Sequence, residues 1–290
     1  MTTNTSVSEP TASEAASNAA NLRARLTTSL MLMPVVLLAV YVGGWLFTIA
    51  SGGLAVIAVL EFYELARGHT AQGRALIGVP MTIAVMLAFQ LQQDGLWVAA
   101  LVIGAIATFV LQIINHPHDV RRTILQTLTT LLGVAYVAFP FAFMIRLRSL
   151  PDGLLWLLVV FALTWGTDTF SYVGGRLWGR NKLAPTLSPK KTVEGAIVGI
   201  LGGMLPALII LALGSKLSQP ALILVALGPF VAIAGDLFES AMKRFFHVKD
   251  SGIKGLDIFP GHGGALDRID ALLLVTAYVF AFVTLFKIIP

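Results

Sequence analysis

Residues 260–289, PGHGGALDRIDALLLVTAYVFAFVTLFKII, join a short glycine-rich bend to a long apolar run. The bend contains Asp267, Arg268 and Asp270, and the next charged residue after these is Lys287. An apolar run of about 20 residues is long enough for a helix to cross the hydrocarbon core of a bilayer. The stretch therefore predicts a membrane-spanning helix that begins at a group of charged side chains.

The composition extends this interpretation to the whole chain of 290 residues. Hydrophobic residues make up 57% of it and charged residues 12%, with a mean hydropathy of +0.84. A soluble domain carries about 25% charged residues, so this chain has too few to cover a surface in water. The long apolar runs lack the alternation of barrel strands, and we expect an all-α polytopic membrane protein. Because cysteine is absent, disulfides, thiolate zinc sites and cysteine nucleophiles are excluded.

Nine apolar segments predict about nine transmembrane helices. They cover residues 27–42, 45–66, 75–91, 95–115, 123–145, 153–175, 192–214, 219–241 and 267–289. If the N-terminus is cytoplasmic, sixteen Lys and Arg residues lie inside and four outside, as the positive-inside rule requires. The net charge of +5 is then explained by topology and by contact with anionic headgroups, and we expect no nucleic-acid partner. At 42–44, VGG either turns the chain between two helices or bends a single long one.

Charge divides the chain into three regions. Residues 1–22 are rich in Ser, Thr and Ala, without the basic start of a signal peptide, and predict a disordered cytoplasmic tail. Residues 23–150 form the N-terminal transmembrane helices, and residues 151–290 form a C-terminal catalytic transmembrane region. Within the latter, the stretches 168–194 and 236–270 contain 18 of the 35 charged residues of the chain. We therefore place the functional site there.

The first charged stretch, residues 168–194, contains side chains that are suited to binding phosphate. Asp168 lies in an otherwise apolar helix, where an ionised carboxylate is costly unless it is paired. In the basic loop that follows, SPKKTVEG supplies lysines and hydroxyls at a helix start, a suitable place for phosphate oxygen atoms. These candidates are Ser188, Lys190, Lys191 and Thr192. The simpler alternative is that Ser188 or Thr192 caps the helix while the lysines reach for headgroups.

The second charged stretch suits a metal ion. Asp236 and Glu239 lie three positions apart on one helix face, and Asp267 and Asp270 repeat this spacing on the next helix. Four carboxylates would repel one another unless cations neutralise them. Oxygen ligands from two helices fit a hard cation, Mg²⁺ above all. The basic residues nearby are Lys243, Arg244 and Arg268.

The GHGG bend offers further contacts. Gly263 and Gly264 place backbone N–H groups at the start of the last helix, where a phosphate is electrostatically favoured. His262 fits a hydrogen-bond donor or proton-transfer group better than a Mg²⁺ ligand. The simpler alternative is that the glycines form an ordinary turn and that Asp267 complements the helix dipole.

Carboxylates for a metal, cations for phosphates and access from lipid indicate phosphoryl or nucleotidyl transfer onto a lipid. A secondary transporter is an alternative, but it predicts acids along a central pathway rather than at one membrane face. A nucleotide-dependent lipid kinase is a nearer alternative. It would release a nucleoside diphosphate, whereas nucleotidyl transfer releases pyrophosphate.

Two segments, SAMKRFFHVKDSG at 240–252 and PGHGGALDRID at 260–270, resemble the signature of the phosphatidate cytidylyltransferases, or CDP-diacylglycerol synthases. Upstream, GTDTFSYVGGRLWGR and LSPKKTVEG are also similar to segments of this family. The resemblance covers about residues 160–290. The spacer at 251–259 is longer than in the family pattern and predicts a longer cytoplasmic loop. The residues that match the signature are Ser240, Lys243, Arg244, Lys249, Asp250, His262, Gly263, Gly264, Asp267, Arg268 and Asp270.

The resemblance implies Mg²⁺-dependent conversion of CTP and phosphatidic acid to CDP-diacylglycerol and pyrophosphate. It implies that Asp236 and Asp267 hold the metal, with a second cation as an option and Asp168 or Asp270 assisting. The residues implied to hold the two substrates' phosphates are Ser188, Lys190, Lys191, Thr192, Lys243, Arg244, Lys249, Asp250, Gly263, Gly264 and Arg268. His262 is implied as a secondary catalytic group. The enzyme would lie in the cytoplasmic membrane as a multi-pass protein, with its site facing the cytoplasm, and the family suggests a homodimer.

We assign no catalytic role to two other groups of polar residues. Glu61, Tyr63 and Glu64 end the second apolar segment, and we expect them to anchor it at the interface. HPHDVRR at 116–122 is expected to be a polar loop between helices rather than a metal site.

Overall fold

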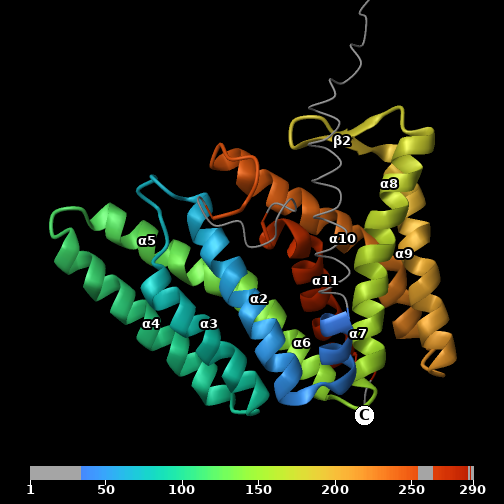
Figure 1. Ribbon diagram of the computed structural model, residues 1–290, viewed down its shortest axis with the longest axis horizontal. Coiled ribbons are helices and arrows are strands. Elements are labelled where there is room, and N and C mark those ends of the chain that lie inside the picture. The colour runs from blue at the N-terminus through green and yellow to red at the C-terminus, as the bar shows by residue number, and fades with distance from the viewer. Residues whose placement is uncertain (1–33, 254–263, 287, 289–290) are drawn as a thin grey trace, which may run out of the picture.

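The computed structural model describes residues 34–253, 264–286 and 288, and these fold into a bundle of helices with one small β-hairpin (Figure 1). Residues 34–42 are helical. The elements that follow are α2 (Gly44–Leu65), α3 (Ala75–Gln90), α4 (Asp94–Asn115), α5 (Val120–Gly133), η1 (Val134–Ala138), α6 (Phe139–Ser149), α7 (Gly153–Phe161), η2 (Ala162–Gly166), α8 (Thr167–Trp178), β1 (Lys182–Ala184), β2 (Ser188–Thr192), α9 (Val193–Leu213), α10 (Gln219–Phe245) and α11 (Leu266–Leu285). The predicted tail at 1–22, and most of the long spacer before Pro260, lie outside the described residues.

Within the described residues, seven helices are long and apolar enough to cross a membrane, which confirms the expected architecture of a multi-pass helical membrane protein. They cover Gly44–Leu65, Asp94–Asn115, Val120–Ser149, Gly153–Trp178, Val193–Leu213, Gln219–Phe245 and Leu266–Leu285. The segment predicted at 75–91 is the helix α3, which at 16 residues is shorter than these spans. The count of nine spans therefore stays a prediction.

The chain turns sharply at VGG, as one of the two sequence interpretations expected. Gly43 and Gly44 have φ angles of 72° and 56°, values that glycine adopts without steric cost, and the helix over 34–42 ends there. The Arg148 guanidinium then donates hydrogen bonds to the carbonyl oxygens of Val40 and Tyr41 at 2.8 and 2.6 Å. These bonds satisfy carbonyl groups that a helix end leaves without partners.

Two of the spans are interrupted by π-helical turns. The first runs through α5, η1 and α6, and the second through α7, η2 and α8. Such π-bulges occur frequently at functional sites. Here η2 ends at Gly166, two residues before Asp168, which lies in the first turn of α8.

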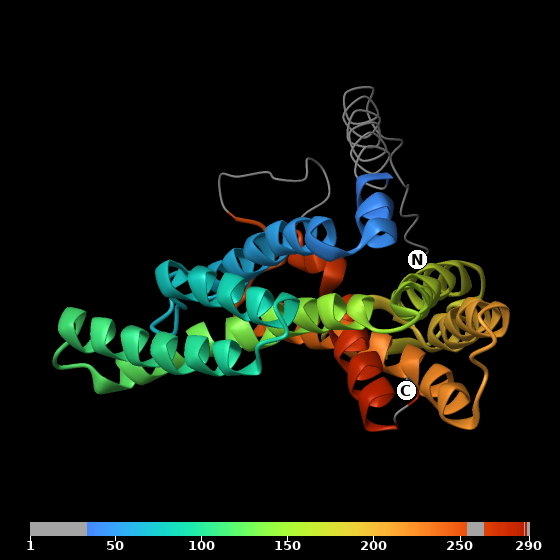
Figure 2. The same cartoon turned by 90° about the horizontal axis from the view of Figure 1, so that it is seen from below.

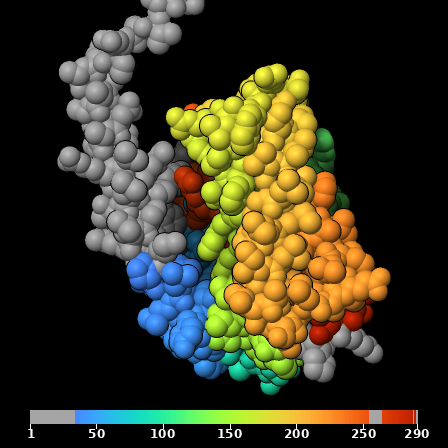
Figure 3. All heavy atoms as spheres, turned by 90° about the vertical axis from the view of Figure 1, so that its right-hand side faces the viewer, coloured from blue at the N-terminus to red at the C-terminus, as the bar shows by residue number. Residues whose placement is uncertain are grey.

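Small residues bring α8 and α9 close together. A Cβ atom added at Gly199 would lie 2.7 Å from the Thr167 carbonyl oxygen, and one added at Gly195 would lie 2.7 Å from that of Ser171. Close approach through glycine is a common mode of helix packing in membranes. Figure 3 shows α8 and α9 side by side, with the hairpin at one end of them. The outward face of α9 is an exposed apolar stripe of Ile197, Leu201, Leu205, Ile209 and Leu213, as expected for contact with lipid.

The hairpin is a difference from the all-α prediction. The basic loop expected before α9 is a two-stranded antiparallel sheet, in which Lys182 pairs with Thr192 and Ala184 with Ser188. Its short strands alternate poorly and carry three lysines, so the apolar pattern gave no signal for them. The hairpin projects beyond the helix ends (Figure 1).

The bundle is elongated, with α4 and α5 at one extremity, α8 and α9 at the other, and α11 between them (Figure 2). One continuous buried cluster contains residues from both the N-terminal and the C-terminal helices, from Ala39 to Val283. Its members include Trp156, Leu157 and Leu273, all 0–1% exposed. The N-terminal helices are therefore packed against the helices that carry the charged stretches.

Candidate active site

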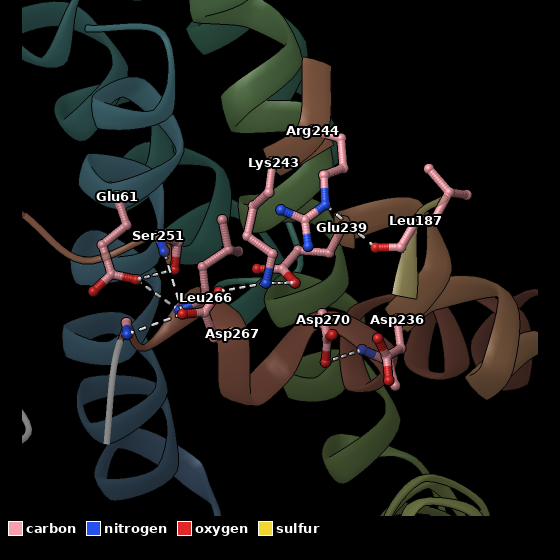
Figure 4. A network of polar contacts seen from close by, with 12 residues as sticks. Glu61, Leu187, Asp236, Glu239, Lys243, Arg244, Ser251, Leu266, Asp267 and Asp270 are labelled. Carbon is pink, nitrogen blue, oxygen red and sulfur yellow. Dashed lines mark hydrogen bonds and ion pairs between the residues drawn. The ribbon is translucent and has the colours of Figure 1, made fainter. Parts of the chain in front are cut away.

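The charged side chains gather where α10 and α11 approach each other. A Cβ atom added at Gly235 would lie 2.9 Å from the Cα atom of Ala271, so only glycine allows this separation of the two helices. Asp236 follows Gly235, and Asp270 precedes Ala271, so the close approach brings the two carboxylates together (Figure 4). The charged groups form two neighbouring clusters along these helices.

The first group, which we call the Asp236 cluster, consists of Asp236, Asp168, Asp270 and Lys191. The Nζ atom of Lys191, in β2, forms an ion pair with the Asp236 carboxylate. Asp168, on α8, interacts electrostatically with Asp236 and Lys191, and Asp270 interacts with all three. Three carboxylates thus face one lysine, and the group carries an excess of negative charge that favours a bound cation.

A pocket of about 380 Å³ lies beside this cluster, between α8, the hairpin and α10. Asp168, Lys191 and Asp236 line it together with Lys190 and Arg176. Its other lining residues include Ser171, Tyr172, Thr192 and Ile233. Acidic groups for a cation and basic groups for phosphates therefore share one cavity of a size that suits a small ligand.

The hairpin is held in place at both of its ends. Thr192 Oγ1 accepts a hydrogen bond from the N–H of Gly195 at 3.1 Å, so Thr192 caps α9, as the simpler alternative for SPKKTVEG expected. The carboxylate of Glu194 accepts hydrogen bonds from the backbone N–H groups of Arg180 and Asn181. These contacts fix the two lysines of β2 relative to α8.

The second group, the Asp267 cluster, is centred on a lysine. Lys243 Nζ lies 2.6 Å from Glu239 Oε2 and 2.9 Å from Asp267 Oδ1 (Figure 4). Glu239 is 1% exposed and its Oε1 atom has no hydrogen-bond partner among the described residues. A buried carboxylate without this lysine would be strongly destabilising.

The other carboxylate oxygen atom of Asp267 accepts hydrogen bonds from the backbone. Asp267 Oδ2 accepts hydrogen bonds from the N–H groups of Gly264 at 3.1 Å and Ser251 at 3.2 Å. The Gly264 N–H, which we expected to contact phosphate, is therefore engaged by a carboxylate in this structure. Asp267 also lies in the first turn of α11, where the helix dipole favours its charge, as the simpler alternative proposed. The expected metal ligands Asp236 and Asp267 thus belong to two different clusters.

Glu61 is a site residue that the sequence interpretation missed. Its oxygen atoms accept hydrogen bonds from the N–H groups of Ala265 and Leu266 at 2.9 and 2.7 Å, and from Ser251 Oγ at 3.3 Å. Because Glu61 is only 2% exposed and Tyr63 3%, the expectation that they anchor α2 at the interface is wrong. The only signal in the sequence was the cost of an acid beside an apolar run, and nothing linked it to a partner some 200 residues away.

Tyr136, in the π-helical turn η1, was also missed. Its ring lies 5.8 Å from that of Phe62 and 5.5 Å from that of Phe238. The hydroxyl group is buried without a partner in the described part of the chain, and it interacts electrostatically with Asp270 and Glu239. Tyr136 therefore borders both clusters.

The remaining predicted site residues lie at the edges of the two clusters. Arg244 is exposed, and its Nε atom donates to the Leu187 carbonyl oxygen at 3.4 Å, which connects α10 to the hairpin. Ser188 begins β2 and is half-buried. Lys249, Asp250 and Arg268 are exposed near the ends of α10 and α11. His262 and Gly263 lie outside the described residues.

Whether Mg²⁺ fits can be judged from the donors present. Among the residues that the structure describes, no group of three or more His or acidic side chains is arranged to hold a metal ion on its own. Mg²⁺ is usually bound by one or two carboxylates together with substrate phosphates and water. The Asp236 cluster has a surplus of negative charge and lies beside a pocket large enough for a small ligand. It therefore fits an ion that is bound jointly by carboxylates and substrate phosphates.

The segment 116–122 forms the connection between α4 and α5 and the start of α5, as expected for a polar loop. Asp119 caps α5, since its Oδ1 atom accepts a hydrogen bond from the N–H of Arg122 at 2.8 Å.

Comparison with known proteins gives a consistent result. The Cytidylyltransferase family matches residues 23–286 of the chain. A phosphatidate cytidylyltransferase of Staphylococcus saprophyticus is 31% identical over 259 residues, which cover 88% of this chain and 96% of that protein. Proteins of the same name from Staphylococcus epidermidis and Staphylococcus aureus are each 32% identical, with the same coverage. Because the match extends over nearly all of its length, the chain belongs to the cytidylyltransferase family.

Proposed function

We propose that this protein transfers the cytidylyl group of CTP to phosphatidic acid, giving CDP-diacylglycerol and pyrophosphate. The observation that carries the proposal is the pocket in which Asp168 and Asp236 face Lys190 and Lys191. Membership of the family and the name shared by its relatives support the choice of nucleotide and lipid. The spans on either side of the pocket support a substrate whose acyl chains stay in the bilayer.

In the reaction, a phosphate oxygen atom of phosphatidic acid attacks the α-phosphorus of CTP. A new P–O bond forms, the bond between the α-phosphorus and the bridging oxygen atom breaks, and pyrophosphate leaves with the electron pair. The attacking phosphate is already ionised near neutral pH, so the step needs no strong general base. Catalysis of this kind depends on positioning and on neutralising charge.

We assign the basic residues by where they lie. Lys190, Lys191 and Arg176 line the pocket and would bind the triphosphate, as basic side chains bind phosphate oxygen atoms. Lys243 lies in the neighbouring cluster, and Arg244 lies at the hairpin. We place the lipid phosphate near these two residues. His262, Lys249, Asp250, Gly263 and Arg268 remain secondary candidates for phosphate contact or proton handling.

We also propose that the reaction requires Mg²⁺. Asp236 would hold the ion, with Asp168 or Asp270 assisting and the nucleotide phosphates completing its ligands. When bound, Mg²⁺ would neutralise charge on the phosphates and stabilise the departing pyrophosphate. In the described structure Asp267 is engaged by Lys243 and two backbone N–H groups, so we assign it to shaping the start of α11 unless substrate binding releases it. A second cation stays a prediction.

The end of the bundle that carries the hairpin would face the cytoplasm. This orientation follows from the distribution of sixteen and four basic residues expected for nine spans, with the N-terminus inside and the protein in the cytoplasmic membrane. CTP would then reach the pocket from the cytosol. A homodimer is an expectation from the family resemblance only.

Product analysis tests the proposed reaction. The purified protein is incubated with CTP, phosphatidic acid and Mg²⁺, and lipid product and soluble product are measured together. We expect one pyrophosphate for each CDP-diacylglycerol formed, and no turnover when EDTA replaces Mg²⁺. Release of CDP together with a phosphorylated lipid would instead establish a lipid kinase and refute the proposal.

A further inference from the structure

A second polar cluster lies in the N-terminal helices, apart from the candidate active site. Arg74, immediately before α3, donates from Nη2 to Gln112 Oε1 on α4 at 2.7 Å and to Gln126 Oε1 on α5 at 3.2 Å. Its backbone N–H donates to Thr130 Oγ1 at 2.9 Å. Arg122 and Thr123 belong to the first turns of α5, beside this network. We call these residues the Arg74 cluster.

The positive charge of the cluster is not matched by a carboxylate of the residues that the structure describes. Burial, and next the charge of Arg122, lower the pKa of Arg74, so the two guanidinium groups are close enough to repel each other. Within the described ranges, neither arginine forms an ion pair with an acid. The acids that lie nearest in the sequence are engaged elsewhere, because Asp119 caps α5 and Glu64 pairs with Arg67 at 2.9 Å. Two half-buried like charges are unfavourable unless an anion joins them.

The cluster also has hydrogen-bond donors without acceptors. Arg74 Nε, Arg122 Nε and Gln112 Nε2 are buried and have no partner among the described residues, and the same holds for Thr123 Oγ1. Gln112 and Thr123 are 0% exposed, so water does not reach them from the surface. Buried polar groups in native proteins nearly always have hydrogen-bond partners, and a buried donor without a partner destabilises the folded state. Three N–H donors that lack partners within the described residues, close to two positive charges, favour a ligand with several acceptor oxygen atoms.

The position of the cluster shows how such a ligand would arrive. Arg74 immediately precedes α3, Gln112 is in the last turn of α4, and Arg122 is in the first turn of α5. In Figure 1 the connection between α4 and α5 and the hairpin both lie in the upper half of the view, at opposite extremities of the long axis of the bundle. Both arginine side chains are half-buried, so they can be reached from outside while their inner donors are shielded. Such a site at a helix end lies where phospholipid headgroups would lie.

We propose that the Arg74 cluster binds the phosphate group of an acidic phospholipid, at a site separate from the catalytic pocket. Guanidinium groups match phosphate geometry through paired N–H donors, and Gln112 Nε2 supplies a further donor. The cluster is also connected to α2, the helix that carries Glu61. Tyr63 Oη donates to the Thr130 carbonyl oxygen at 2.8 Å, and Tyr63 lies two residues after Glu61 on α2. Phosphate binding at Arg74 therefore stabilises the packing of α2 against α5.

The test compares two adjacent arginines. The full-length protein is placed in phosphatidylcholine nanodiscs with and without phosphatidylglycerol, an acidic lipid that is not the proposed substrate, and its unfolding temperature is measured. Arg122→Gln removes a cluster residue, and Arg121→Gln removes the same charge from the exposed neighbouring position. We expect phosphatidylglycerol to raise the unfolding temperature of the wild type and of Arg121→Gln. For Arg122→Gln, we expect the lipid concentration that gives half the effect to rise about tenfold.

A second arm distinguishes the source of the phosphate. Inorganic phosphate is added to the protein in phosphatidylcholine nanodiscs. If millimolar phosphate alone stabilises the wild type and Arg121→Gln but not Arg122→Gln, the ligand is a soluble phosphate at the same residues. If the protein does not fold with Arg122→Gln, Arg122→Lys keeps the charge but loses the paired donors, and it should weaken the response. Equal losses in the variants at 121 and 122, or no stabilisation by either anion, would overturn the proposal, whatever the outcome for CTP turnover.

Discussion

The carboxylate of Glu61, near the end of α2, accepts a 2.7 Å hydrogen bond from the backbone N–H of Leu266, the first residue of α11. The same carboxylate accepts a bond from the N–H of Ala265. These N–H groups would otherwise remain unsatisfied at a buried helix start. An N-terminal helix thereby fixes where α11 begins, and with it the positions of Asp267 and Asp270.

Glu61→Gln should destabilise the protein. The new amide replaces one acceptor oxygen with a donor, so a buried N–H at the start of α11 loses its partner, at a cost of about 1–3 kcal/mol. We expect a lower unfolding temperature and a lower kcat for CDP-diacylglycerol formation, since Asp270 lies one turn farther along the helix. Unfolding is followed by heating in detergent, and kcat by lipid product.

Glu64→Gln is the matched control for Glu61. Glu64 pairs with Arg67, whose side chain is 53% exposed, and such pairs contribute about 1 kcal/mol or less. Equal unfolding temperatures for the two glutamine variants would contradict the claim that the hydrogen bonds of Glu61 stabilise the start of α11.

Lys191→Ala should weaken binding of CTP. Lys191 lines the pocket and pairs with Asp236, so its removal takes one positive charge from the triphosphate site and leaves Asp236 without its partner. Loss of a charge-assisted contact of this kind corresponds to at least about a tenfold rise in KM for CTP. Steady-state kinetics at saturating phosphatidic acid measures it.

Lys182→Ala serves as the control for Lys191. Lys182 lies on the same hairpin, at the exposed start of β1, and does not line the pocket. The KM of the Lys182→Ala variant for CTP should stay within about twofold of the wild-type value. An unchanged KM in the Lys191 variant would remove this lysine from the nucleotide site.

Lys243→Met should be strongly destabilising, because Glu239 and Asp267 would lose the cation that they share. Breaking a buried pair by removing one partner costs about 3–5 kcal/mol. A second change, Glu239→Gln, removes one of the two acids that are left, and it should recover part of the lost stability. A thermal-unfolding cycle of the two single variants and the double variant checks this. Strictly additive losses would show that the two side chains are not coupled.

The sequence was sufficient for most of the fold because the membrane imposes simple rules. Apolar runs and glycine breaks predicted the helices from α2 to α11 to within a few residues, and the turn at Gly43 is one of the two interpretations that VGG allowed. The hairpin was not predicted, since its strands are short, basic and without apolar alternation. The continuous span through α5, η1 and α6 extends farther than the segment expected at 123–145, because its polar ends, around Arg122 and Arg148, continue the helix.

The site was predictable in its composition but not in its pairing. The spacing of Asp236 with Glu239, and of Asp267 with Asp270, correctly placed these acids on facing helices. Which cation meets which acid depends on helix rotation and on the close approach at Gly235, and a single sequence does not contain this information. Glu61 and Tyr136 were missed for the same reason, because their partners lie far away along the chain.

The most direct test of the account is CDP-diacylglycerol formation by Asp236→Asn compared with Asp152→Asn. Asp152 is also paired with a lysine, Lys216, but it lies before α7, outside the pocket, with a φ of 56° that asparagine tolerates. Both variants are assayed with CTP, phosphatidic acid and Mg²⁺ after their folding has been verified. We predict a loss of kcat of at least about a hundredfold for Asp236→Asn and near wild-type activity for Asp152→Asn. Wild-type turnover by folded Asp236→Asn would contradict the claim that nucleotidyl transfer takes place at the Asp236 cluster.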